Sequence, residues 1–174
     1  MRNQNQSLRA FTLVELMVVI SIIAVLVALL FPAIKTAMIK AETGKAKATV
    51  MSIASAFKAL DREYGGWPSS SVMSTPQDLA TNLFSNPRNT VFLEIASKDI
   101  DSGGYIVDPW KNRYRVAFDT TGANSIANPF SSGTPNPIPD NVIVWSRGPD
   151  GMTSDTTDGS SGTTANDADN ITSW

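Results

Sequence analysis

Residues 9–31, RAFTLVELMVVISIIAVLVALLF, decide the fold because they contain a long apolar run with one acidic side chain in it. From Leu16 to Phe31, 15 of 16 residues are apolar, and Ser21 is the exception. As a helix, the 21 residues from Phe11 to Phe31 would measure about 31 Å, which matches the roughly 30 Å hydrocarbon core of a membrane. We therefore predict a helix that crosses a membrane once.

The flanks of this run indicate its orientation. Residues 1–10 are polar and carry Arg2 and Arg9 without an acidic residue, which predicts a cytoplasmic N-terminus and an exported remainder. An ordinary signal peptide, cut near Ala33 or Ala37, is the alternative. The apolar run is longer than the usual core of such a peptide, about 7–15 residues, and this favours a retained segment.

Glu15 is the acidic residue in the first turns of the run. A charged side chain at the centre of a spanning helix costs about 2.5–3.5 kcal/mol on insertion scales. No Lys or Arg lies within a helical turn of it in the sequence. Either Glu15 lies among the lipid headgroups, or its cation comes from another chain or from a new N-terminus made by proteolysis.

The stretch 9–20, RAFTLVELMVVI, resembles the class III signal of type IV pilins and type II secretion pseudopilins. The resemblance implies that a prepilin peptidase cuts between Ala10 and Phe11 and that the new amine of Phe11 is methylated. It also implies that Glu15 pairs with the free amine of a neighbouring subunit. Ala10 stands where the family usually has Gly, and this small side chain should still fit a narrow protease pocket. Pro32 falls where the family places a proline that kinks the helix.

The helical pattern continues beyond Pro32, which should bend the helix just before it or, alternatively, end the membrane span. Apolar residues then recur at spacings of three and four, as on one face of a helix. They are Ala46, Val50, Ile53, Phe57, Leu60 and Tyr64. Gly65, Gly66 and Pro68 should end this helix. Its amphipathic half therefore needs a domain to cover the apolar face.

The remaining residues predict a small α+β domain with an antiparallel sheet laid on the amphipathic half of the helix, a pilin-like fold. Residues 75–79 look like the start of a helix, and residues 90–95 suit either a strand or a short helix. Three further segments read as strands: 105–107, 114–118 and 142–145. The expected organisation is a leader at 1–10, an apolar half-helix at 11–31, an amphipathic half-helix at 32–64 and a domain at 65–174.

Two regions of this domain resemble the major pseudopilin of type II secretion. Residues 108–114, DPWKNRY, resemble its DPWGxxY turn, and residues 146–151 and 169–174 resemble its C-terminal region. Lys111 replaces the usual Gly. Because Gly tolerates a positive φ, one expectation is that the turn has a different conformation here.

Residues 148–174 form an acidic segment with five Asp and neither Lys nor Arg. Such a composition suits a disordered segment unless a cation is bound. Ile171 and Trp174 favour a segment that folds back over the domain and buries Trp174. Oxygen-rich loops suit Ca²⁺, which takes 6–8 oxygen ligands.

The family resemblance implies one Ca²⁺ in this acidic segment. Asp150 would be a side-chain ligand, and the main-chain oxygens of Arg147 and Met152 are neighbours by position. Four aspartates are candidates for the second carboxylate: first Asp167 and Asp169, then Asp155 and Asp158.

The composition excludes several classes of function. With no His and no Cys, the chain cannot form His-dependent triads, thiol nucleophiles or His/Cys zinc sites. A net charge of −2 provides no basic surplus for nucleic acid. We expect neither an enzyme nor a nucleic-acid partner.

The resemblance implies a structural subunit of a type II secretion pseudopilus. Its partners would be copies of itself, minor pseudopilins, the prepilin peptidase and the inner-membrane secretion platform. It would cross the bacterial inner membrane once, with its domain in the periplasm, and assemble into a filament. The alternatives are a type IV pilus subunit for adhesion, motility or DNA uptake, and an exported ligand-binding domain or enzyme.

Overall fold

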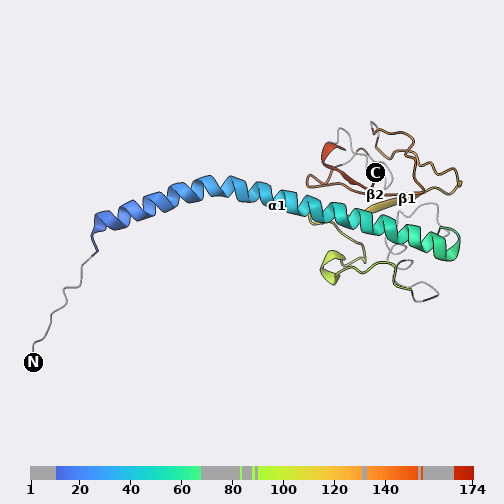
Figure 1. Ribbon diagram of the computed structural model, residues 1–174, viewed down its shortest axis with the longest axis horizontal. Coiled ribbons are helices and arrows are strands. Elements are labelled where there is room, and N and C mark those ends of the chain that lie inside the picture. The colour runs from blue at the N-terminus through green and yellow to red at the C-terminus, as the bar shows by residue number, and fades with distance from the viewer. Residues whose placement is uncertain are drawn as a thin grey trace, which may run out of the picture. The chain divides into compact units, whose positions relative to one another are not determined.

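The computed structural model describes residues 11–67, 83, 88, 90–130, 133–152, 154 and 167–174. Its elements, in chain order, are α1 (Leu13–Tyr64), η1 (Ser97–Asp99), β1 (Arg115–Phe118), β2 (Val142–Ser146), η2 (Asp167–Asp169) and β3 (Ile171–Thr172) (Figure 1). This arrangement confirms the predicted α+β fold. The chain divides into two compact units, Met1–Ala41 and Glu42–Trp174, and α1 contributes to both.

In the first unit every described residue, from Phe11 to Ala41, is exposed. Most of the side chains from Phe11 to Phe31 are large and apolar on all faces of the helix, a surface that is unfavourable in water. Pro32 lies inside α1, so it does not end the helix, and its carbonyl accepts a hydrogen bond from Thr36 Oγ1 at 3.1 Å. The predicted kink at Pro32 stays a prediction.

In the second unit α1 buries one face, and the predicted apolar stripe is confirmed. Its buried residues are Ala46, Val50, Ile53, Ala54, Ala56, Phe57 and Leu60. Tyr64 is partly buried against the same core. Fully burying a side chain such as Phe57 contributes about 1.5–3 kcal/mol, so packing, more than helix propensity, holds this half of α1.

Within the residues that the structure describes, the sheet has three antiparallel strands in the order β1-β2-β3. Val116 pairs with Val144, and Trp145 pairs with Thr172. The strand β3 confirms that the last described segment, residues 167–174, folds back on the domain. Lys47 of α1 donates a hydrogen bond to the Thr172 carbonyl and so ties β3 to the helix.

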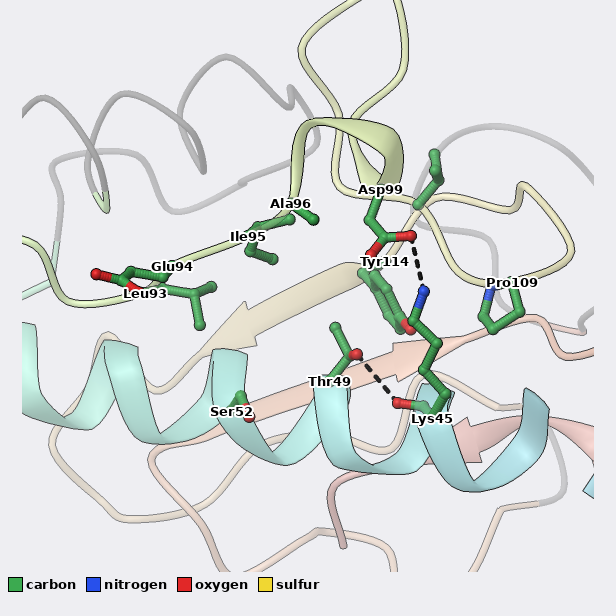
Figure 2. A pocket seen from close by; sticks show the side chains of 11 residues that line it. Lys45, Thr49, Ser52, Leu93, Glu94, Ile95, Ala96, Asp99, Pro109 and Tyr114 are labelled. Carbon is green, nitrogen blue, oxygen red and sulfur yellow. Dashed lines mark hydrogen bonds and ion pairs between the residues drawn. The ribbon is translucent and has the colours of Figure 1, made fainter. Parts of the chain in front are cut away.

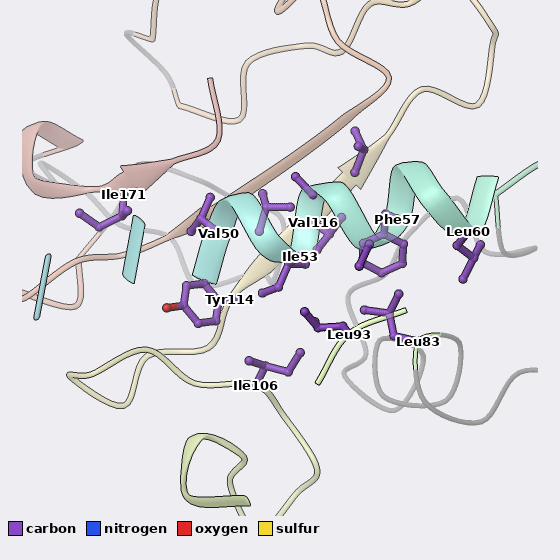
Figure 3. Close-up of a cluster of buried hydrophobic side chains, with 14 of the residues drawn as sticks. Val50, Ile53, Phe57, Leu60, Leu83, Leu93, Ile106, Tyr114, Val116 and Ile171 are labelled. Carbon is purple, nitrogen blue, oxygen red and sulfur yellow. The ribbon is translucent and has the colours of Figure 1, made fainter. Parts of the chain in front are cut away.

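The central strand β2 is buried along its whole length because it faces two cores. Successive side chains of a strand point to opposite faces. Val142 and Val144 join the core on α1, which Figure 3 shows with Phe57 and Leu60. On the other face, Ile143 and Trp145 join a second core of the residues Ile126, Phe130 and Ile138, with Trp174 packed against it.

Other predicted elements differ from the structure. Residues 90–95, predicted as a strand or a short helix, form neither, and η1 begins shortly after them at Ser97. Ile106 and Val107 make only isolated bridges, to Ile100 and Arg113, because the turn at 108–112 follows at once. The predicted helix start at 75–79 lies outside the described residues.

Lys111 adopts the left-handed conformation, with φ of 74°. The turn therefore keeps the shape that a Gly would take there, despite the Lys. A non-Gly residue in this conformation is strained by roughly 1–2 kcal/mol, whereas Gly costs about 0.5–1 kcal/mol in chain entropy.

We expect Lys111→Gly to raise the free energy of unfolding by about 0.5–1 kcal/mol, the difference between those two costs. Denaturant unfolding of the purified protein in detergent measures the change. Lys98→Gly, placed in η1, is the matched control and should destabilise the protein. Equal destabilisation by both variants would contradict the strain at Lys111.

Candidate functional site

The N-terminus of α1 holds Glu15 in a reciprocal capping arrangement with Thr12. The Thr12 backbone N–H and the Thr12 hydroxyl both donate to Glu15 Oε2, at 2.9 and 2.8 Å. In return the Glu15 backbone N–H donates to Thr12 Oγ1 at 3.2 Å. This is the capping box in which an N-cap Thr and a Glu three residues later each satisfy a free backbone N–H.

Sequence reasoning missed the part played by Thr12, although the T-x-x-E spacing could have revealed it. The box uses only one carboxylate oxygen. Glu15 Oε1 accepts no hydrogen bond from the residues that the structure describes, so it can take a cation while Oε2 stays on Thr12.

We expect Thr12→Val to loosen the first turn of α1, because loss of an N-cap costs about 0.5–2 kcal/mol. Amide hydrogen exchange of Leu13–Leu16 in micelles should then accelerate by roughly two- to thirtyfold, which corresponds to that cost. Thr12→Ser keeps the hydroxyl and should exchange like the original protein. Unchanged exchange in the Val variant would exclude the box as a stabilising contact.

Of the other residues predicted at the assembly site, Phe11 is 76 % exposed and directly precedes the box. Ala10 lies outside the described residues. The helix α1 is long and apolar enough to cross a membrane, by length and composition. Between Glu15 and Lys35 the sequence has no charged residue, so Glu15 lies at the edge of the apolar stretch.

In the second unit the structure brings together two of the predicted cation ligands, Asp150 and Asp169. The Asp150 backbone N–H donates to Asp169 Oδ2 at 3.3 Å. Asp150 Oδ1 accepts a hydrogen bond from the Met152 N–H at 2.8 Å, which closes the turn. Burial, and then the negative charge of Asp150, raises the pKa of the Asp169 carboxyl above its ordinary value. The carboxylates of Asp150 and Asp169 thus lie close together at a partly buried position.

Asp167, which the sequence ranked equally with Asp169, has other partners. Its Oδ1 accepts hydrogen bonds from the Ser154 N–H and from Asn170 Nδ2, both at 2.9 Å. Its Oδ2 accepts a hydrogen bond from Ser154 Oγ at 2.5 Å. These bonds join Ser154 to Asp167 and Asn170 within the acidic segment, so Asp167 suits a role in holding this segment together better than a role as a ligand.

The Asp150–Asp169 pair has the chemistry that a hard cation requires. Asp169 Oδ1 is buried and accepts no hydrogen bond from the described residues, so a buried carboxylate oxygen lacks a donor. Arg147 and Met152 flank the turn that carries Asp150. In the described part of the chain no three acidic side chains gather as a metal-binding group, so main-chain oxygens would complete the ligand set. Asp155 and Asp158 lie outside the described residues.

A small cavity of about 150 Å³ lies between α1 and the segment 93–99 (Figure 2). Its lining includes Lys45, Thr49 and Tyr114, and Lys45 Nζ pairs with Asp99 Oδ1 at 2.8 Å. Pockets for small molecules typically measure roughly 300–1,000 Å³ and are mostly apolar. This cavity is smaller and already holds an ion pair.

Ser55 and Lys58 on α1 have the S-x-x-K spacing of a serine nucleophile and its base, which sequence reasoning also passed over. Lys58 Nζ instead forms an ion pair with Asp140 at 2.9 Å. The Ser55 hydroxyl makes no hydrogen bond within the described residues, and Ser55 is exposed. This geometry does not activate a nucleophile.

Comparison with known proteins identifies one motif. Residues 7–31 match the family model of the prokaryotic N-terminal methylation motif. The chain therefore carries a type IV pilin-like signal, the kind of sequence that prepilin peptidases process. Together with the apolar half of α1, this signal fits a membrane-anchored protein with a single span. Neither the curated proteins nor the solved structures contain a match to this chain.

Proposed function

We propose that this protein is a structural subunit of a type II secretion pseudopilus. A prepilin peptidase cuts it between Ala10 and Phe11, and Phe11 is methylated. The mature chain then polymerises through α1 with copies of itself and with minor pseudopilins, on an inner-membrane secretion platform. The domain lies in the periplasm.

The observation that carries this proposal is the methylation motif on a helix whose apolar residues are exposed on all sides. Such a helix is stable only in lipid or against other apolar helices. The single acidic residue in the apolar run of this helix, Glu15, lies one turn from the new amine that the cut would create at Phe11. A neighbouring subunit offers that amine to Glu15 Oε1, and contacts that repeat head to tail build a filament.

Calcium binding in the second unit is part of the same proposal. Asp150, Asp169 and the main-chain oxygens of Arg147 and Met152 would hold one Ca²⁺. Bound there, the ion supplies the positive charge that the Asp150–Asp169 pair lacks. The buried, unpartnered Asp169 Oδ1 supports this assignment. The acidic segment would then be fixed on the sheet through β3.

A type IV pilus subunit is the alternative, because the methylation motif does not distinguish a pilus from a pseudopilus. The DPWKNRY turn, with Lys111 in the conformation of a Gly, favours the pseudopilus. The small cavity with its internal ion pair does not favour an exported ligand-binding domain.

N-terminal mass spectrometry of the protein, purified from membranes of cells that contain a prepilin peptidase, tests the proposal. We expect a chain that starts at methylated Phe11. A start after Ala33 or Ala37 would identify an ordinary signal peptide and refute the proposed assembly. Without the peptidase the full leader should remain.

A further inference from the structure

The turn at 108–112 and the turn at 146–151 are joined through one buried carboxylate. Asp108 is only 1 % exposed. Its Oδ1 accepts hydrogen bonds from the Trp110 and Asn112 N–H groups, at 2.9 and 2.8 Å. Its Oδ2 accepts hydrogen bonds from Ser146 Oγ at 2.5 Å and from Asn112 Nδ2 at 3.3 Å. The carboxylate thus fixes both its own turn and the end of β2.

Asn112 extends this network into the second turn. Its Nδ2 also donates to the Gly148 carbonyl at 2.7 Å. The Gly148 N–H donates to Ser146 Oγ at 3.1 Å. Both polar backbone groups of Gly148 are therefore held by side chains that hydrogen-bond Asp108.

Gly148 and Gly151 leave little room for any other position of this turn. A Cβ on Gly148 would lie 2.2 Å from the Asp169 carbonyl oxygen, so the turn is in close contact with η2. A Cβ on Gly151 would lie 3.1 Å from Asn112 Oδ1. Asp150 lies between these two glycines, and its backbone N–H reaches Asp169.

We propose that Asn112, oriented by Asp108, is a positioning residue for the divalent-cation site at Asp150 and Asp169. It holds the Gly148 carbonyl and thereby sets the turn that carries Asp150 against η2. The inference rests on the calcium binding in the proposed function. It explains why a buried Asp and an Asn occupy a turn that itself contributes no cation ligand.

The physical reason is preorganisation. Removing the Asn112 side chain leaves the Gly148 carbonyl without its donor and frees the turn to move away from Asp169. Groups that orient metal ligands without touching the metal typically change its affinity by 10–100-fold. The Asp108–Ser146 bond remains in such a variant, so the end of β2 keeps its anchor.

The test is a calorimetric titration of calcium chloride into the full mature protein in detergent, for the original chain, Asn112→Ala and Arg113→Ala. Arg113 is the matched control, since it lies beside Asn112 but its side chain contacts Asp101 and Tyr105. We expect the calcium dissociation constant to rise at least tenfold in Asn112→Ala and to change less than threefold in Arg113→Ala. Melting in EGTA, recorded for each variant, separates an effect on folding from an effect on binding.

The outcomes distinguish the two hypotheses. If the original protein does not bind calcium, the calcium part of the proposed function fails, and this inference fails with it. If the original protein binds calcium and Asn112→Ala binds equally well, this inference alone is overturned, even if the variant melts earlier in EGTA. Should Asn112→Ala not fold, Asn112→Ser, which keeps a small polar side chain too short for the Gly148 carbonyl, takes its place with the same expectation.

Discussion

Replacing Glu15 by Val should leave the protein in the membrane and abolish its filaments. Insertion is expected to persist because the substitution removes a charge that costs up to about 2.5–3.5 kcal/mol in the apolar core. Assembly is expected to fail because the amine of a neighbouring Phe11 then has no carboxylate to pair with. Loss of more than about 1.4 kcal/mol per contact lowers the association constant more than tenfold.

The measurement is the fraction of protein in sheared filaments, with the membrane fraction as the control for insertion. Glu15→Gln separates charge from shape, since its side-chain oxygen can still accept the two hydrogen bonds from Thr12. We expect Gln to fail as Val does. A bulky residue in place of Ala10, which blocks cleavage, should give the same loss because no free amine forms. Normal filaments from Glu15→Val would end the pairing hypothesis.

The long helix and the central strand could be predicted because their residues carry a simple period. The stripe from Ala46 to Leu60 repeats every three or four residues, and only a helix brings such positions to one face. The run 142–145 is apolar throughout, which suits a strand that is buried on both faces. The methylation signal could be predicted equally well, because its residues are consecutive in the sequence.

The rest depended on contacts between distant residues. Asp167 and Asp169 are alike in the sequence, and only the position of Ser154 and of Asp150 distinguishes them. The bond from Asn112 to Gly148 joins residues that no local pattern connects. Residues 90–95 suit a strand or a short helix by sequence, but a strand also needs a hydrogen-bonded neighbour, which sequence patterns do not supply.

Neutralising Asp169 should change the stability of the protein in opposite directions with and without calcium. In EGTA at pH 7 we expect Asp169→Asn to melt at a higher temperature than the original protein. Burial and the nearby Asp150 raise the pKa of this carboxyl in the folded state above its ordinary value of 3.8. A raised folded pKa means that the group's stabilising contribution is present at pH below about 4 and is lost as pH rises through the folded pKa.

With calcium, we expect the original protein to melt at a higher temperature than Asp169→Asn. A ligand present at 100 times its dissociation constant stabilises the folded state by about 2.7 kcal/mol. For a chain of this size that corresponds to a melting temperature higher by roughly 5–10 °C. The original protein should show this gain and protection of residues 148–174 from protease, whereas Asp169→Asn should show little of either.

Asp101→Asn is a control for which we expect the opposite change in melting temperature. The backbone hydrogen bond from Tyr105, followed by those from Gly103 and the charge of Arg113, holds the pKa of Asp101 below its ordinary value. Its stabilising contribution is present at neutral pH and is lost on acidification, so its neutralisation should lower the melting temperature equally with and without calcium. Differential scanning fluorimetry at pH 7 and at pH 4 measures all three proteins. If Asp169→Asn melts at a lower temperature than the original protein in EGTA at pH 7, repulsion between Asp150 and Asp169 does not destabilise the cation-free protein.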